Sequence, residues 1–252
     1  MKITIITSAY NSEKTIEETI RSVLTQTYNE IEYIVIDAAS SDNTLEIINH
    51  YKNQIDIIVS EPDQGIYDGL NKGIVLAKGD VIGFLHSDDL YENDEVIEKV
   101  ALAFANSKVD SVYGDLVYVS EKDTSKIFRY WKSGQFRPQK LKRGWMPPHP
   151  TFFVRRKVYQ QYGYFNTSLK ISADYDSILR FLGKHKITTF YLPEVLIKMR
   201  VGGESNKSLK NLIQKSREDL RAIKSNNIGN FGSLIFKNIS KIPQFLALKN
   251  SL

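Results

Sequence analysis

The first 85 residues alternate four short apolar runs with three helical patterns, and this alternation limits the fold more than any other feature of the chain. The runs are rich in Ile and Val, as buried strands are, and they occupy residues 3–7, 31–36, 55–60 and 81–85. Between them, apolar residues recur three or four positions apart, which is the spacing of an amphipathic helix. Such an alternation forms a mostly parallel sheet with right-handed crossovers. We therefore expect an α/β fold in which a Rossmann-like, mostly parallel central sheet is flanked by helices.

All four predicted strands end in polar residues. Thr7 ends the first and Asp37 the second, the third continues into residues 60–63, and the fourth leads to Asp88 and Asp89. Parallel strands bring their carboxyl ends to one edge of the sheet, where open α/β proteins bind their ligands. This edge is the predicted site.

The adjacent carboxylates of Asp88 and Asp89 follow closely on an apolar run. Carboxylates beside a core are costly unless a cation or hydrogen-bond donors meet them. Neighbouring side chains of an extended chain point to opposite faces. We therefore expect one acid to bind a metal ion and the other to contact a ligand hydroxyl or a backbone amide. An acidic turn with Asp helix caps is the alternative.

The second half of the chain is less regular. We expect helices at residues 95–105, 156–162 and 174–185, a hairpin of strands 111–119 and 127–131, and strands at 151–154, 188–192 and 195–199. Residues 132–150 contain several Gly and Pro residues and one of the two Trp residues of the chain. A long irregular segment inside a compact domain is often functional.

The excess positive charge lies at the C-terminal end. No acidic residue follows Asp219, and the last 33 residues contain five basic ones, so the preceding chain has 29 basic and 29 acidic residues. A nucleic-acid-binding protein usually carries basic residues over a docking face. We therefore expect no nucleic-acid partner.

Residues 206–252 form a predicted basic, amphipathic helical tail. Its apolar residues recur at helical spacing, at Leu209, Leu212, Ile213, Leu220 and Ile223 and again at Phe231, Ile235, Ile239, Ile242, Phe245 and Leu246. An apolar and basic helix without acids is typical of a membrane interface, so one hypothesis is contact with an anionic membrane surface. The other is a helix docked on the body with its basic face in solvent.

Composition restricts the compartment. The chain of 252 residues has no Cys, which rules out disulfides, thiolate chemistry and Cys-ligated zinc. No apolar stretch approaches the ~20 residues that span a bilayer, and the first residues lead directly into a strand without a signal-peptide pattern. We expect a cytoplasmic protein, held on the inner face of the cytoplasmic membrane if the tail is interfacial.

Several motifs occur in an order that is specific in combination. They are Thr7–Asn11, Asp37–Thr44, Glu61–Asp68, Asn71–Gly73, Lys78–Asp80, His86–Asp89, His149–Thr151 and Ala173–Asp176. Through them, residues 1–205 resemble the family 2 glycosyltransferases of the GT-A fold, above all the bacterial enzymes that build capsule, O-antigen and other exopolysaccharides. The resemblance implies one domain with a nucleotide-binding half at residues 1–110 and an acceptor half at residues 111–205.

The same resemblance implies a nucleotide-sugar donor. The donor-binding residues would be Thr7, Tyr10, Asp37, Asp68, Lys72 and Asp88. A UDP-sugar is favoured, because a carboxylate can accept from a pyrimidine N–H while an aromatic ring stacks on the base. Asp89 would ligate the Mg²⁺ or Mn²⁺ that bridges the two phosphates, since such cations commonly use one or two carboxylates plus phosphate oxygens.

The implied reaction is displacement at the anomeric carbon with inversion, onto a glycan or lipid-linked acceptor. A carboxylate takes the proton of the attacking hydroxyl, and Asp174 matches the family's base position, where a helix N-terminus would keep it ionised. A helix cap is the alternative for Asp174. Asp176 lies about 200° around the helix from Asp174, so both cannot face one hydroxyl. His149 and Asp176 are candidates for contacts to the acceptor or the diphosphate.

Two other functions fit parts of the pattern. A nucleotidyltransferase would need a Gly-rich loop after the first strand, and residues 8–11 do not form one; the glycine fingerprints of NTPases and dehydrogenases are also missing. A non-catalytic subunit that binds a nucleotide sugar or a partner enzyme at the membrane is disfavoured by the presence of Asp37, Asp88, Asp89 and Asp174. The donor sugar, the acceptor and the oligomeric state are left open.

Overall fold

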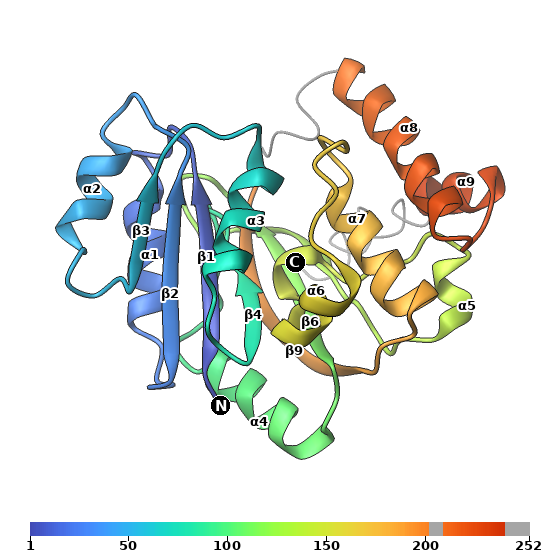
Figure 1. Cartoon of the computed structure of the whole chain (residues 1–252), viewed down its shortest axis with the longest axis horizontal. Coiled ribbons are helices and arrows are strands. Elements are labelled where there is room, and N and C mark those ends of the chain that lie inside the picture. The colour runs from blue at the N-terminus through green and yellow to red at the C-terminus, as the bar shows by residue number, and fades with distance from the viewer. Residues whose placement is uncertain (202–208, 240–252) are drawn as a thin grey trace.

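The computed structural model describes residues 1–201 and 209–239 of the chain (Figure 1). The strands are β1 (Ile3–Ala9), β2 (Ile31–Asp37), β3 (Ile57–Ser60), β4 (Val81–Phe84), β5 (Leu90–Tyr91), β6 (Ser111–Val119), β7 (Ile127–Trp131), β8 (Phe153–Arg155) and β9 (Thr189–Arg200). The α-helices are α1 (Ile16–Leu24), α2 (Thr44–His50), α3 (Ile66–Leu76), α4 (Val96–Ser107), α5 (Pro138–Leu141), α6 (Arg156–Tyr162), α7 (Ala173–Ile178), α8 (Leu209–Ser225) and α9 (Phe231–Ile239). A 3₁₀ turn (His149–Thr151) precedes β8, and a π-helical segment (Leu179–Lys184) continues α7.

Within the described residues the nine strands form one sheet. Their order is β3-β2-β1-β4-β8-β6-β9-β5, and β7 pairs with β6. The first four strands are parallel, which confirms the predicted α/β fold. β3 begins at Ile57 and not at Ile55. The N–H of Tyr33 donates to the Asp56 carboxylate at 2.8 Å, so a side chain takes the place of the backbone carbonyl that a longer strand would offer.

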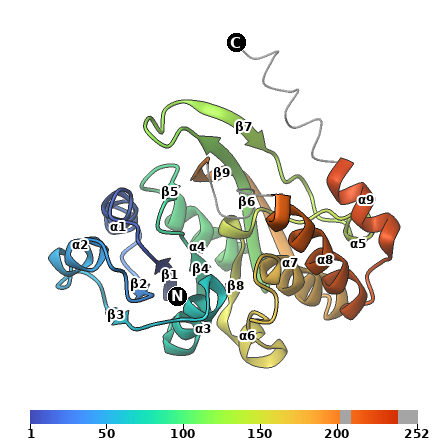
Figure 2. The ribbon, with the colours of Figure 1, turned by 90° about the horizontal axis from the view of Figure 1, so that it is seen from above.

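Helices cover both faces of the parallel strands (Figure 2). On one face, α1, α2 and α4 bury apolar residues such as Ile20, Ile48 and Val100 in the core cluster that also contains Val35 of β2. On the other face, α3 and α6 bury residues such as Leu70 against Ile36 of the same strand. Because both faces are covered, these strands are mostly apolar. The buried exceptions Thr4 and Glu32 hydrogen-bond to each other at 2.6 Å.

The second half of the sheet is mixed. β8 lies antiparallel between β4 and β6, and β6 also pairs with β7 in a hairpin and with β9 in parallel. We expected two strands at residues 188–192 and 195–199, but the chain forms the single strand β9. A register shift between Tyr191 and Val195 leaves Pro193 out of the pairing with β6. Pro has no N–H to donate, and a bulge is where a strand tolerates it.

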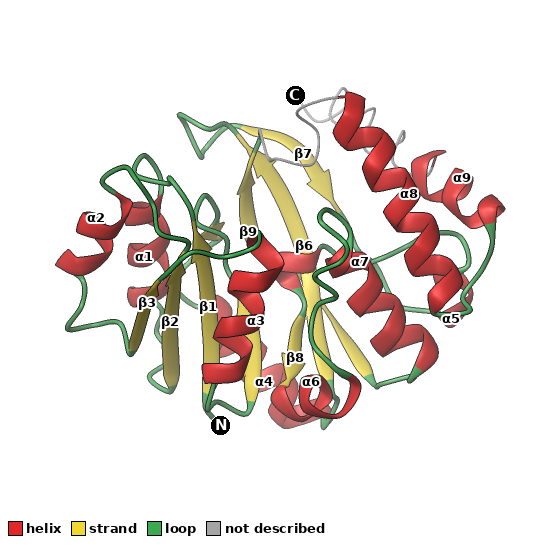
Figure 3. Cartoon of the chain, turned by 45° about the horizontal axis from the view of Figure 1, so that its top comes forward, coloured by secondary structure: helices red, strands yellow, loops and turns green. Residues whose placement is uncertain are grey.

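The described part of the predicted tail is docked on the body, where α8 packs against α7 and α9 packs against α8 (Figure 3). Ala222, Ile223 and Leu234 are buried in the core cluster that α7 also joins. The Glu218 carboxylate accepts the backbone N–H groups of residues 170–172 at 2.7 to 3.1 Å. These contacts attach α8 to the loop that leads into α7.

Part of the tail prediction falls outside the described residues. This applies to the boundary between residues 205 and 206, to the side chains of Leu209 and Ile239, and to Ile242, Phe245 and Leu246. In the ranges 1–201 and 209–239, no helix combines the length and the apolar character that crossing a bilayer requires.

Candidate active site

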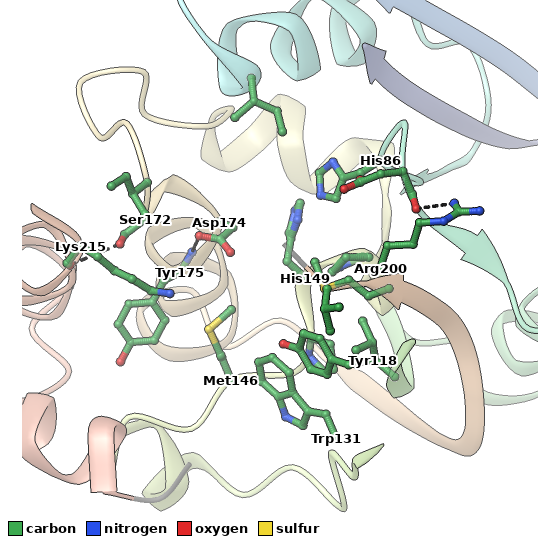
Figure 4. A pocket seen from close by; sticks show the side chains of 18 of the residues that line it. His86, Tyr118, Trp131, Met146, His149, Ser172, Asp174, Tyr175, Arg200 and Lys215 are labelled. Atoms are coloured by element: carbon green, nitrogen blue, oxygen red, sulfur yellow. Dashed lines mark hydrogen bonds between the residues drawn. The ribbon is translucent and has the colours of Figure 1, made fainter. Parts of the chain in front are cut away.

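The carboxyl edge of the sheet faces a cavity of about 540 Å³ (Figure 4). Its walls come from the segment after β4, the start of α3, the β6–β7 hairpin, the loop before β8, the start of α7, the end of β9 and the helices α8 and α9. Three predicted site residues line it, namely Asp88, His149 and Asp174. The others do not line it: Thr7, Tyr10, Asp37, Asp68, Lys72, Asp89 and Asp176.

The two adjacent acids after β4 have opposite environments. Asp88 lines the cavity, whereas Asp89 is 0% exposed, and its Oδ1 accepts the N–H of Arg200 at 3.3 Å. Burial, together with the charge of Asp88, raises the pKa of Asp89 well above its usual range. The two acids therefore have different surroundings, as strand geometry predicts. Oδ2 of Asp89 is buried and has no hydrogen-bond partner among the described residues, so the metal assignment to Asp89 stays a prediction.

Arg200, at the end of β9, fixes the turn that carries both acids. Its guanidinium donates to the carbonyl of Asp88 at 2.7 Å and to the carbonyl of Glu121 at 3.3 Å, and it pairs with the Glu18 carboxylate on α1. Sequence reasoning missed this residue, because an Arg at the end of a strand carries no signal of what it contacts more than 100 residues away.

The donors beside Asp88 suit a divalent cation. Nδ1 of His86 is buried and has no hydrogen-bond partner in the described part of the chain. Burial lowers the pKa of His86, so its imidazole is neutral at pH 7, as a metal ligand must be. No group of three or more His, Cys, Asp or Glu side chains within residues 1–201 and 209–239 could hold a metal ion. An ion here would therefore take its remaining ligands from phosphates and water.

His149 lines the cavity beside His86 and packs against Phe84 of β4. Its ring stacks on Phe84 at 5.3 Å and lies 6.0 Å from the ring of His86. Burial lowers the pKa of His149 to about 4, so the side chain is uncharged at neutral pH. It can exchange hydrogen bonds with a ligand, but it cannot balance the charge of a diphosphate.

Asp174, in the first turn of α7, is held by hydrogen bonds to only one of its two carboxylate oxygens. Its Oδ1 accepts the O–H of Tyr67 at 3.2 Å and the N–H of Tyr175 at 2.7 Å. Burial and the Asp174 charge raise the pKa of Tyr67 well above its usual range, so this hydroxyl remains a donor. Oδ2 of Asp174 has no hydrogen-bond partner among the residues described, and the side chain lines the cavity. This arrangement leaves one carboxylate oxygen available to a ligand hydroxyl.

Asp176 does not belong to the cavity. Its Oδ1 accepts from the Asn226 amide at 2.9 Å, and its Oδ2 lies 3.7 Å from the Arg180 guanidinium. The side chain is buried on the opposite side of α7 from Asp174, as the helical rotation of about 200° requires. These contacts join α7 to Asn226, just after α8, and the contact of Asp176 to the acceptor or the diphosphate stays a prediction.

Two residues predicted to contact the nucleoside, Thr7 and Asp37, have partners within the protein, and their nucleoside contacts stay predictions. The Thr7 hydroxyl lies 3.1 Å from the Tyr33 hydroxyl and is fully buried, because odd positions of β1 face α1 and α4. The Asp37 carboxylate is also fully buried, and it accepts from the hydroxyls of Ser40 and Ser60. It thereby holds the turn after β2. Tyr10, in contrast, is 63% exposed at the end of β1 and is free to stack on a base.

Asp68 and Lys72 lie on the first turns of α3, outside the cavity. The Lys72 ammonium lies 2.9 Å from the Glu61 carboxylate and donates to the Pro62 carbonyl at 2.9 Å. The Asp68 carboxylate accepts the N–H of Gln64 at 3.1 Å. Both residues therefore order the loop between β3 and α3, and the predicted phosphate contact of Lys72 would have to displace Glu61.

The docked helices bring cations to the cavity that the sequence pattern did not reveal. The Lys237 ammonium of α9 lies 2.7 Å from Asp219 Oδ1 and 3.2 Å from the ring centroid of Tyr175. Both partners of the ion pair are about 97% buried, at 3% and 2% exposure, and burial lowers the pKa of Lys237. Lys215 of α8 lines the same end. The basic residues at helical spacing predict a face in solvent, and no local sequence signal distinguishes Lys215 and Lys237 from the other lysines of these helices.

A family model described as "Glycosyl transferase family 2" matches residues 4–163. This chain belongs to that family. The match covers β1 to α6 and contains Asp88 and His149, while Asp174 and the docked helices follow it.

Relatives of this family 2 transferase carry glycosyltransferase names. A "PGL/p-HBAD biosynthesis glycosyltransferase" of Mycobacterium bovis is 31% identical over 212 residues, which cover 80% of each chain. A "Chondroitin synthase" of Pasteurella multocida is 28% identical over 261 residues, which cover 99% of this chain and 26% of that protein.

Solved structures identify the fold of the transferase as GT-A. S. aureus TarS 1-349 in complex with UDP superposes with a TM-score of 0.67 at 21% identity, over 88% of this chain and 65% of that one. The mannosyltransferase PcManGT from Pyrobaculum calidifontis, in complex with GDP-Man and Mn²⁺, gives a TM-score of 0.66 at 17% identity, over 98% of this chain and 73% of that one.

Proposed function

We propose that this protein is an inverting, metal-assisted glycosyltransferase that moves a sugar from a nucleotide sugar to a glycan or lipid-linked acceptor in cell-surface polysaccharide biosynthesis. The observation that carries the proposal is the pair Asp88 and Asp174, which face one cavity from different elements. One carboxylate sits beside a neutral imidazole, and the other has an unpaired oxygen. An inverting transfer needs these two roles at two separate places.

The donor side of the cavity is the end that contains Asp88 and His86. We assign the Mg²⁺ or Mn²⁺ to Asp88, with His86 as a second candidate ligand, in place of Asp89. When bound, the ion stabilises negative charge on the departing diphosphate. UDP, UDP-GlcNAc and GDP-Man are named in the complexes of the structural neighbours, and Mn²⁺ in one of them. A UDP-sugar remains our first choice, with Tyr10 stacked on the base.

Asp174 acts as the general base. Tyr67 and the Tyr175 N–H hold Oδ1, so the acceptor hydroxyl donates its hydrogen bond to Oδ2. As the acceptor oxygen attacks the anomeric carbon, its proton passes to Asp174 and the bond from that carbon to the diphosphate oxygen breaks. The sugar is transferred to the acceptor, and the nucleoside diphosphate leaves. Attack from the side opposite the leaving group inverts the anomeric centre.

The acceptor sugar has an aromatic wall available in the β6–β7 hairpin. Tyr118 and Trp131 line the cavity there, and the Arg129 guanidinium lies 4.8 Å from the ring centroid of Tyr118 and 5.6 Å from that of Trp131. Aromatic faces bury the C–H face of a sugar ring at low entropic cost. We therefore extend the acceptor half from residues 111–205 to include α8 and α9, which close the cavity on the other side.

We also place the protein at the inner face of the cytoplasmic membrane. Phe231, Ile235 and Phe236 of α9 are 61%, 46% and 57% exposed, and Phe236 shares a surface groove with Lys142 and Arg143. Exposed apolar residues beside cations fit an anionic lipid surface. Binding to anionic liposomes should be lost on Phe231→Ser/Phe236→Ser and reversed by salt; equal binding by this double variant at low salt would contradict the assignment.

Release of nucleotide from a panel of UDP- and GDP-sugars tests the enzymatic proposal. We expect release with at least one donor in the presence of Mg²⁺ or Mn²⁺, and none after chelation with EDTA. Nucleotide binding without release from any donor would support the alternative, a non-catalytic subunit that binds nucleotide sugars. The panel also identifies the donor.

A further inference from the structure

One end of the cavity holds two lysines beside Asp219, and Asp174 lies close enough for its charge to act on one of them. Lys215 of α8 and Lys237 of α9 both line it, and Asp219, one helical turn after Lys215, lies 2.7 Å from the Lys237 ammonium. Within residues 1–201 and 209–239, no carboxylate lies within ion-pair distance of the Lys215 ammonium. Asp219 is thus committed to Lys237, whereas the Lys215 ammonium has no ion-pair partner in these ranges.

The two ammonium groups are close enough to influence each other. Burial lowers the pKa of Lys237, the charges of Asp219 and Asp174 oppose this effect, and the charge of Lys215 adds to the lowering. Lys215 is half-buried on the cavity wall, where solvent screens its charge less than on an open surface. An anion bound at this end would relieve the repulsion and would meet a partly desolvated ammonium.

The position of Lys215 separates it from the donor side. Figure 4 shows Asp174 between Lys215 on one side and His86 with Arg200 on the other. Lys215 also lies beside Ser172, whose hydroxyl contacts the Lys215 carbonyl at 3.5 Å. A ligand whose hydroxyl reaches Asp174 from the side of α8 would therefore pass Lys215 and Ser172.

We propose that Lys215 forms a subsite for an anionic substituent, a carboxylate or a phosphate, on the acceptor glycan. This inference rests on the proposed function, because it places the acceptor on the α8 side of Asp174. Lys215 then selects acidic acceptors over neutral ones, while the buried pair of Lys237 and Asp219 keeps α9 in place behind it.

Matched pairs of glycans test this subsite directly. The probes are chondroitin oligosaccharides and the same chains with their carboxylates reduced to alcohols, and maltooligosaccharide 6-phosphates with their unphosphorylated counterparts. Binding is measured calorimetrically on the full chain with UDP and Mg²⁺ present. We expect at least one acidic probe to bind about tenfold tighter than its neutral twin, since a hydrogen-bonded charge contributes about that much.

Three variants separate the subsite from general effects. Lys215→Gln should abolish the preference for the acidic probe, Lys215→Arg should keep most of it, and Lys224→Gln, on the exposed face of the same helix, should leave it unchanged. UDP affinity should be the same in all of them, and thermal melting checks that each variant is folded. The class of probe that shows the preference decides between carboxylate and phosphate.

Three outcomes would overturn the inference. They are equal affinity for acidic and neutral twins in both pairs, no binding of any acidic probe, and a Lys215→Gln variant that weakens UDP binding instead of glycan binding. In each of these cases, nucleotide release from a donor would still support the proposed function. If release also fails with every donor, the proposed function itself is contradicted.

Discussion

The two halves of the sheet differ in how their polar residues find partners. At the ends of β1 to β4, polar side chains form hydrogen bonds with residues of nearby turns. In the other half, the cavity residues come from segments far apart in the chain. Asp37 binds Ser40 and Ser60 around one turn. In contrast, Asp174 meets Tyr67 from across the molecule, and Glu218 of α8 binds the loop before α7. The first half thus forms an edge from local contacts, and the second half closes a cavity over it.

This difference separates residues that shape the site from residues that act in it. We expect substitution of an acid at a strand end in the first half to disorder the adjacent turn. Substitution of a cavity residue in the second half should leave the sheet intact. Four substitutions test the separation, and the first has the largest expected effect.

Asp174→Asn should lower sugar transfer about a thousandfold, within the range that general-base removal usually costs. The amide can still accept from Tyr67 and the Tyr175 N–H, so UDP affinity and thermal stability should hardly change. Turnover in a donor assay and UDP binding by calorimetry measure the two effects. Wild-type turnover in the variant would mean that Asp174 is a helix cap and not the base.

Asp88→Asn should lower metal-dependent nucleotide release about 100-fold, because metal-ion stabilisation of a leaving group contributes several kcal/mol. Asp89→Asn is the matched control, since it makes the same change one residue further, in a fully buried side chain. We expect the control to alter melting temperature more than metal affinity. A larger loss of Mn²⁺ affinity in the Asp89 variant would restore the assignment made from sequence.

Glu218→Gln should destabilise the fold by about 2 kcal/mol at pH 7, since backbone donors would lose a charged acceptor. Burial alone would raise the pKa of Glu218, but hydrogen bonds from Gln214 and from residues 170–172 outweigh it, so the pKa is lowered. The stabilisation is therefore complete above the unfolded pKa and is lost as pH falls through the folded one. Urea unfolding at pH 7 and at about pH 3 should show the difference between variant and wild type disappear at the lower pH; a constant difference would contradict this origin.

Trp131→Ala should raise the KM for the acceptor about fivefold to tenfold, which corresponds to the free energy of one aromatic contact. UDP affinity should not change, because Trp131 belongs to the hairpin wall and not to the donor side. Ile127→Ala, on the same strand, 48% exposed and outside the cavity lining, is the comparison variant. If KM for acceptor is unaffected by Trp131→Ala, the aromatic wall is not part of the acceptor site.

The sequence predicts the parallel half of the fold well, because periodicity and polar strand ends are local signals. It also identifies Asp88, His149 and Asp174 as cavity residues. It does not predict which neighbours a polar side chain finds: Asp89 is held by the backbone of Arg200, 111 residues away. For the same reason, Lys215 and Lys237 look like ordinary surface lysines in the sequence, and only the docking of α8 and α9 brings them into the cavity.

The ion pair between Lys237 and Asp219 also has a consequence for synthesis of the protein. All nine strands of the sheet lie within the first 200 residues, whereas Lys237 belongs to α9 (Phe231–Ile239). A ribosome that adds roughly 5–20 residues per second delivers the sheet seconds before α9. For that interval the nascent chain holds the carboxyl edge of the sheet with one wall of the cavity missing, and the cavity is enclosed only when α9 has emerged.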